Sequence, residues 1–162
     1  MSKVIKVGMA DLNFAKAPDS IRTSGLGSCV GVIIYDDTTK FCGMAHIMLP
    51  ESTLSRNGII QRAKYADTAI EDLLKSFKNE GIPSFRLKAK MAGGAQMFKF
   101  SSGSDLMRIG PRNVEAVRDI LKKNLIKLIS EDVGGSSGRT IEFYPDTSLL
   151  EIRTVNKGVK SI

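Results

Sequence analysis

The chain has 162 residues, 42% of them hydrophobic and 25% charged, a composition that predicts one ordinary globular domain over residues 1–162. No apolar run approaches the roughly 18–20 residues that span a bilayer, and the first residues lack a signal-peptide core, so we expect a cytoplasmic protein without membrane insertion. The net charge of +7 comes from scattered basic residues, with no Trp and no interleaved aromatics, which argues against nucleic-acid binding.

Short β-rich segments dominate the first part of the chain. The patterns predict strands over 4–7, 30–35 and 40–48. An irregular polar stretch is expected from the first of these strands to Ser20, and a loop of small residues over 23–28 ends at Cys29. A polar turn at 36–39 joins the other two strands, which we therefore expect to form a β-hairpin.

Two helices and further strands follow. Apolar residues spaced by three and four predict a helix over 61–79, which Gly81 ends. Alternation over 85–91 predicts a half-buried strand, and a second helix is expected after Gly110 and Pro111. Three more strands are predicted over 125–133, 140–144 and 149–155. The pattern is that of an α+β domain with more strand than helix.

The glycine-rich segments do not fit a nucleotide site. The segment at 25–30 lacks the third glycine of a dinucleotide fingerprint and leads into a strand instead of a helix. Neither 93–94 nor 134–138 ends in the Gly-Lys-Ser/Thr of a phosphate loop. Two cysteines and one histidine are too few for a structural zinc site. We expect no cofactor and no metal.

The two cysteines differ in their relation to His46. Cys42 lies four residues away on the same strand, a span of roughly 13 Å that prevents a hydrogen bond, so we interpret it as a core residue. If Tyr35 pairs with Lys40 across the turn, Cys29 faces His46 directly, with Cβ atoms roughly 4.5–5.5 Å apart. Cys29 is then a candidate nucleophile and His46 its general base, although two buried core residues would explain the pair equally well.

The surrounding residues suit thiol chemistry. An adjacent imidazolium would lower the pKa of the Cys29 thiol and provide thiolate at neutral pH. Gly27 and Ser28 would let a substrate approach the sulfur, and their N–H groups, with that of Cys29, are candidates for an oxyanion hole. A third group should orient the histidine ring: Thr23, Ser24, Ser28 or a main-chain carbonyl, a choice that these residues alone leave open.

A combination of short motifs resembles the CheD family of chemoreceptor glutamine deamidases. The motifs extend over nearly the whole chain and lie at 23–31, 45–50, 64–66, 92–95, 109–110 with 113–114, and 132–139. The resemblance implies a catalytic set of Cys29, His46 and Thr23. It also implies a mixed β-sandwich flanked by helices, similar to the deamidating domain of cytotoxic necrotizing factor toxins.

The resemblance implies two kinds of partner. The substrates would be particular glutamines of methyl-accepting chemotaxis receptors, hydrolysed to glutamate. Some family members also bind CheC, a phosphatase acting on the response regulator CheY. One alternative is a regulatory adaptor of receptors and CheC with secondary catalysis, in which Met97, Phe98 and Phe100 form either a binding patch or part of the core. A transglutaminase or peptidase using the same thioester is a further alternative.

Overall fold

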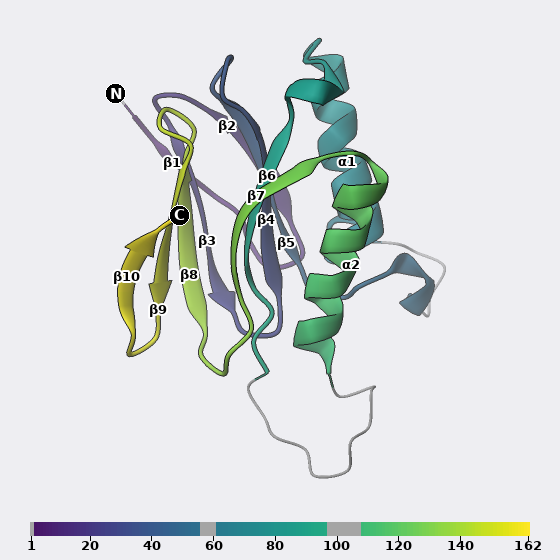
Figure 1. The fold of residues 1–162 in the computed structure, drawn as a ribbon, viewed down its shortest axis with the longest axis vertical. Helices are drawn as coiled ribbons and strands as arrows, with labels where there is room; N and C mark the ends of the chain where they lie inside the picture. Colours follow the sequence, from purple (N-terminus) through teal and green to yellow (C-terminus); the bar gives the residue numbers. More distant parts are fainter. Residues whose placement is uncertain (1, 56–60, 97–107) are drawn as a thin grey trace.

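The computed structural model describes residues 2–55, 61–96 and 108–162. Within these residues, two five-stranded sheets pack face to face, and two α-helices cover the outer face of one of them (Figure 1). The first sheet has the order β1-β3-β8-β9-β10, with strands Val4–Lys6, Ser20–Leu26, Arg139–Tyr144, Leu149–Thr154 and Gly158–Ser161. The second has the order β2-β5-β4-β6-β7, with strands Leu12–Lys16, Phe41–Ile47, Val30–Asp36, Lys88–Gly93 and Lys127–Val133.

The pairing is mixed in both sheets, because β1 runs parallel to β3 and β6 parallel to β7 while their other pairs are antiparallel. The helices are α1, Ala66–Asn79, and α2, Ile109–Lys123, and short 3-10 turns occur at Ser52–Leu54, Arg62–Lys64 and Ser84–Arg86. The predicted α+β sandwich with flanking helices is confirmed. No helix in the described ranges is long and apolar enough to cross a membrane.

Strand β4 explains the uninterrupted apolar run at 30–35. All seven of its residues are buried, because one face packs against the helices and the other against the opposite sheet. A strand that is enclosed on both faces loses the alternation of polar and apolar residues that marks a half-exposed strand. The side chains toward the helices are Val30, Val32 and Ile34, and those toward the other sheet include Ile33 and Tyr35.

Both helices are amphipathic, as their spacing predicts. Helix α1 begins at Ala66, later than expected, and ends at Asn79. Glu80 is its C-cap, and the φ of +75° at Gly81 suits the position after a C-cap. Helix α2 begins at Ile109, two residues before Pro111. Proline is tolerated there because the first N–H groups of a helix have no intrahelical acceptor.

Three strands differ from the sequence predictions. Strand β2 lies within the stretch expected to be irregular, and β10 was not expected. The loop predicted at 23–28 is wrong in its first half, because β3 continues to Leu26 between β1 and β8. Thr23 therefore stands on a strand, where it pairs with Ile141 of β8 and follows directly on the last pair with β1, Lys6 with Arg22.

The strand predicted at 85–91 is confirmed from Lys88 onward, but it is wrong over 85–87 and in being half-buried. Phe85 lies in a 3-10 turn and is 85% exposed, whereas β6 starts at Lys88 and is buried on both faces. Lys90 is buried because its ammonium group donates hydrogen bonds to the carbonyls of Ser148 and Ile162. Burial with these partners makes a charged residue compatible with a central strand.

The hairpin of β4 and β5 forms with a different register from the one predicted. Asp36 pairs with Phe41, so the turn is 37–40 instead of 36–39. Asp36 stays in the strand because its carboxylate accepts hydrogen bonds from the Thr38 and Thr39 amides, and its carbonyl accepts one from Lys40, whose φ is +61°. The carboxylate thus caps the loop from the end of β4, and the four-residue turn begins one residue later than predicted.

Candidate active site

The corrected register places Gly31 opposite His46, so the prediction that Cys29 lies directly opposite the histidine is wrong. A shift of two residues keeps every side chain on its face of the sheet. Cys29, just before β4, and His46 therefore still face the space between the two sheets, as diagonal neighbours at a backbone separation of roughly 7–8 Å. Cys29 packs in that inter-sheet core and keeps 8% of its area exposed, whereas His46 is fully buried.

His46 contacts Thr23 across the gap between the sheets. The Thr23 hydroxyl lies 2.7 Å from Nδ1 of His46 and donates a hydrogen bond of 2.8 Å to the carbonyl of Val7. A hydroxyl has a single proton, so Thr23 must accept from an Nδ1–H group. The neutral ring then carries its lone pair on Nε2, which is buried and has no hydrogen-bond partner among the described residues.

The pKa values of Cys29 and His46 both shift in the direction that disfavours an ion pair between them. Burial lowers the pKa of His46 below its ordinary value of 6.5, and burial raises the pKa of the Cys29 thiol above 9.0, only partly offset by its own backbone N–H. At pH 7 the free protein therefore has a neutral imidazole and a thiol, instead of the expected thiolate and imidazolium. A neutral ring with its lone pair on Nε2 can accept a proton from a nearby thiol.

Gly31 allows the two sheets to approach at this point. A Cβ atom at Gly31 would lie 2.6 Å from Cδ1 of Ile141 and 3.6 Å from Cγ2 of Thr23. The space beside His46 is thus filled by side chains of the opposite sheet, and only glycine leaves room for them. The Thr23 hydrogen bond across the sandwich depends on this close approach.

The loop before Cys29 is held by its carbonyl groups. The carbonyl of Gly27 accepts from the Ala95 amide at 2.8 Å, and that of Cys29 accepts from the Gly94 amide at 2.9 Å. The carbonyl of Ser28, between them, accepts from the side-chain amide of Asn113 at 3.0 Å. The N–H groups of Ser28 and Cys29 donate to no other residue in the described parts of the chain.

Asn113 is a site residue that the sequence analysis did not single out. It is fully buried on α2, and its Nδ2 donates at 3.0 Å both to Ser28 and to the carbonyl of Met48, two residues after His46. One amide therefore connects the Cys29 loop to the end of the His46 strand. The available signal was a polar residue in the apolar stripe of a helix, between Gly110 and Val114.

The remaining sequence candidates separate clearly. Cys42 lies on the same sheet face as His46, is fully buried, and has a pKa raised to about 12 by burial. These properties confirm its interpretation as a core residue. The possible patch of Met97, Phe98 and Phe100 lies outside the described residues. Among the described residues, no three His, Cys, Asp or Glu side chains gather as a metal site would require.

Comparisons with known proteins identify the family. A family model described as CheD chemotactic sensory transduction matches residues 48–154. A curated protein of Halalkalibacterium halodurans, named chemoreceptor glutamine deamidase CheD, is 59% identical over 162 residues, which is 100% of both chains. The chain belongs to the CheD family.

Other CheD relatives agree over the same length. The chemoreceptor glutamine deamidase CheD of Bacillus subtilis is 56% identical over 159 residues, covering 98% of this chain and 96% of the relative. A probable chemoreceptor glutamine deamidase CheD of Lachnoclostridium phytofermentans is 50% identical over 162 residues, 100% of both chains. The match to the CheD family model begins at residue 48, after Thr23, Cys29 and His46, whereas these relatives cover nearly the whole chain.

Proposed function

We propose that this protein is a cytoplasmic enzyme that deamidates glutamines of methyl-accepting chemotaxis receptors through a thioester on Cys29. The observation that carries the proposal is the double hydrogen bond of Thr23, which leaves Nε2 of His46 as the free base on the face that Cys29 shares. The substrate class is supported by the names of the relatives, which are called chemoreceptor glutamine deamidases.

The first half of the reaction forms the thioester. The Cys29 sulfur attacks the side-chain carbonyl carbon of glutamine while Nε2 of His46 takes the thiol proton. The N–H groups of Ser28 and Cys29 stabilise the resulting oxyanion, and Gly27 keeps the approach to the sulfur open. The carbon–nitrogen bond then breaks, and the imidazolium gives its proton to the departing ammonia.

The second half releases glutamate. Neutral His46 takes a proton from water as its oxygen attacks the thioester carbon, and the imidazolium returns the proton to sulfur when the carbon–sulfur bond breaks. Thr23 keeps the ring in one tautomer throughout, because its hydroxyl remains committed to the Val7 carbonyl. The net change converts one amide and one water to one carboxylate and one ammonium ion.

A second part of the proposal is that the protein binds CheC and stimulates this CheY-phosphate phosphatase. Two observations support it: the chain belongs to the CheD family, and its motifs resemble a family in which some members bind CheC. A role as an adaptor with secondary catalysis makes a different prediction, since CheC stimulation would then persist in an enzyme without measurable turnover.

The test compares the two cysteines. Purified receptor fragments are incubated with the protein, and conversion of glutamine to glutamate is followed by mass spectrometry. Cys29→Ala should lower the rate by at least about a thousandfold, as loss of a nucleophile does. Cys42→Ala is the matched control: it should lower the free energy of unfolding by about 1 kcal/mol and leave turnover intact.

Hydroxylamine added during turnover should capture the acyl group as a hydroxamate at the target glutamine, because it attacks thioesters. Wild-type conversion rates in Cys29→Ala would refute the nucleophile assignment. Absence of any conversion by the wild-type protein, together with retained CheC stimulation, would favour the adaptor.

A further inference from the structure

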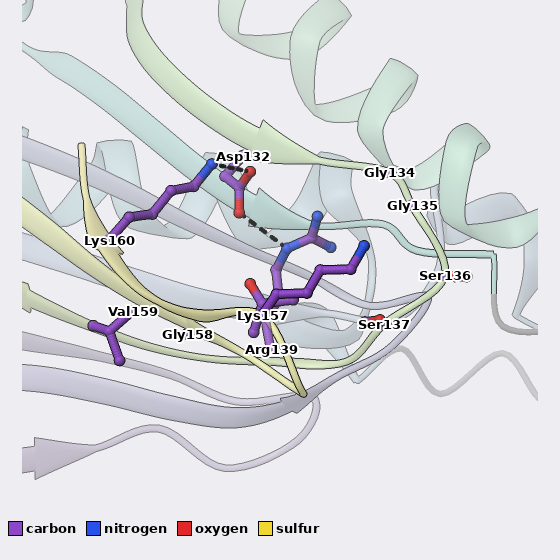
Figure 2. Close-up of a pocket in the computed structure, with 11 residues that line it drawn as sticks. Asp132, Gly134, Gly135, Ser136, Ser137, Arg139, Lys157, Gly158, Val159 and Lys160 are labelled. Carbon is purple, nitrogen blue, oxygen red and sulfur yellow. Dashed lines mark hydrogen bonds and ion pairs between the residues drawn. The ribbon is translucent and has the colours of Figure 1, made fainter.

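A cavity of about 270 Å³ lies between the β7–β8 turn and the hairpin of β9 and β10. Its lining holds three cationic side chains, Arg139, Lys157 and Lys160, against one carboxylate, Asp132 (Figure 2). Asp132 is already paired, at 2.9 Å with Lys160 and at 3.2 Å with Arg139. The cavity therefore retains positive charge that no described residue neutralises.

Arg139 is buried, and only part of its guanidinium group has hydrogen-bond partners. Its side chain is 7% exposed, Nε pairs with Asp132, and Nη1 donates to the carbonyl of Gly93 at 3.3 Å. Nη2 donates to no described residue. A buried guanidinium with free N–H groups that lines a cavity is a ready donor to an oxyanion.

Further donors surround this nitrogen. Lys157 makes no ion pair within the described residues, and Figure 2 shows its ammonium group extended toward the turn on the same side as the Arg139 guanidinium. The N–H groups of Gly135, Ser136 and Ser137, and both serine hydroxyls, donate to no described residue. The cavity is thus lined by donors and by cations, with its single carboxylate occupied.

The cavity adjoins the candidate nucleophile. The carbonyl of Gly93 accepts from Arg139, while the next amide, that of Gly94, donates to the carbonyl of Cys29. A single peptide unit therefore separates the guanidinium from the Cys29 loop. In Figure 1 the end of β3, the start of β4, the β7–β8 turn and the β9–β10 turn all lie at the lower end of the sandwich. A protein segment that reaches Cys29 from this end passes the cavity.

We propose that this cavity binds an Asp or Glu carboxylate carried by the same substrate segment as the target glutamine. The inference rests on the proposed function, and it adds a requirement for the residues that flank the glutamine. One free guanidinium nitrogen and one ammonium group match the two oxygens of a carboxylate. A carboxylate tethered to the glutamine is held at high effective concentration, so even a shallow pocket selects for it.

The experiment uses two helix-forming peptides that contain one glutamine. In the first, Glu residues stand one helical turn before and after the glutamine, and in the second, Ser replaces them. Wild-type protein should release ammonia from both peptides with similar kcat and a KM about tenfold lower for the Glu peptide. Lys157→Glu should abolish this KM difference and leave kcat unchanged, because the residue does not touch the reacting atoms.

Lys127→Glu is the matched control. It makes the same change in net charge on an exposed residue at the other end of β7, and it should keep the wild-type preference. Equal peptide preference in the Lys157→Glu and Lys127→Glu proteins would overturn the proposal, since the effect would then come from net charge or be absent.

A binding measurement separates this proposal from the proposed function. In a Cys29→Ala background, which does not turn over, fluorescence anisotropy of the labelled Glu peptide should show about tenfold weaker binding when Lys157→Glu is added. This readout holds even if no ammonia is released by the wild-type protein. Unchanged peptide affinity on adding Lys157→Glu would refute the carboxylate pocket. A loss of affinity, in the case where the wild-type protein releases no ammonia, would refute only the proposed deamidase activity.

Discussion

The two ends of the sandwich are closed in different ways. At the β4–β5 turn, the buried Asp36 carboxylate accepts hydrogen bonds from Thr38, Thr39 and the Arg86 guanidinium, with an ion pair of 2.7 Å to Arg86. At the other end, the loop ending at Cys29 is held by main-chain carbonyls and by a single side-chain amide, that of Asn113. An ion pair thus closes the β4–β5 turn, and neutral hydrogen bonds hold the Cys29 loop itself. The ion pairs of Asp132 with Arg139 and Lys160 lie beyond that loop, on the far side of the Gly93 carbonyl.

The difference has a consequence for chemistry. A carboxylate beside Cys29 would repel the oxyanion of the proposed mechanism and would compete for the N–H groups of Ser28 and Cys29. Holding the loop by its carbonyls instead leaves those N–H groups unpaired within the described chain. The turn at Asp36 has no such requirement, so a charged network stabilises it.

The largest effect should come from Gly93, which touches the Cys29 loop. Its φ is +116°, and a Cβ atom there would lie 2.3 Å from the Cys29 carbonyl oxygen. We expect Gly93→Ala to lower the free energy of unfolding by more than about 3 kcal/mol and to abolish deamidation. Gly81→Ala is the control, because its φ is also positive but nothing lies within 4 Å, so it should cost only about 1 kcal/mol. Denaturant unfolding measures the stability of both variants, and receptor turnover measures their activity. Equal losses in Gly93→Ala and Gly81→Ala would contradict the close contact between Gly93 and the Cys29 carbonyl.

A smaller effect is expected from Asn113, and it separates the two ends most directly. Asn113→Ala leaves the carbonyls of Ser28 and Met48 without their donor, which should cost about 2–3 kcal/mol of unfolding free energy. It should also lower kcat about tenfold or more, because the Cys29 loop loses its link to the His46 strand. Asp36→Ala should cost about 2–3 kcal/mol as well, but with unchanged kcat of the folded fraction. If both variants lost kcat equally, the two ends would not be independent.

The smallest effect is on the pH profile. The proposed mechanism needs a neutral His46 and a protonated Cys29 thiol, and burial shifts the two pKa values apart. The acidic limb of kcat/KM should therefore lie below 6.5, where the ring becomes protonated, and the basic limb above 9.0, where the thiol ionises. Rates measured across this pH range, with a pH-stable receptor fragment, locate both limbs. A basic limb below 9.0 would contradict the raised pKa of the thiol, because the imidazolium of a preformed ion pair would then be losing its proton.

Local pattern predicted most of the fold. The helices and the central strand β4 have strong periodicity or a continuous apolar run, so their existence follows from burial alone. The register of the hairpin did not follow, because it depends on whether Asp36 belongs to the strand or to the turn. That choice is made by hydrogen bonds within the turn and by Arg86, 50 residues away.

The candidate site was predicted in part. Spacing alone brought Cys29 and His46 to one face of a hairpin and separated Cys42 from them. The residues alone named Thr23 as one of four candidates for orienting the ring, and only the family resemblance chose it. Its contact with His46 crosses from one sheet to the other and has no local signature. Asn113 was missed for the same reason: its two acceptors lie 85 and 65 residues away.

The position of Thr23 also links chemistry to assembly. Thr23 belongs to one sheet and His46 to the other, and Gly31 permits the contact between them. A partly folded chain with undocked sheets has a thiol and an imidazole in no fixed relation, and its histidine is free to adopt either tautomer. The tautomer that carries its proton on Nδ1 and its lone pair on Nε2 is therefore fixed only when the two sheets have docked.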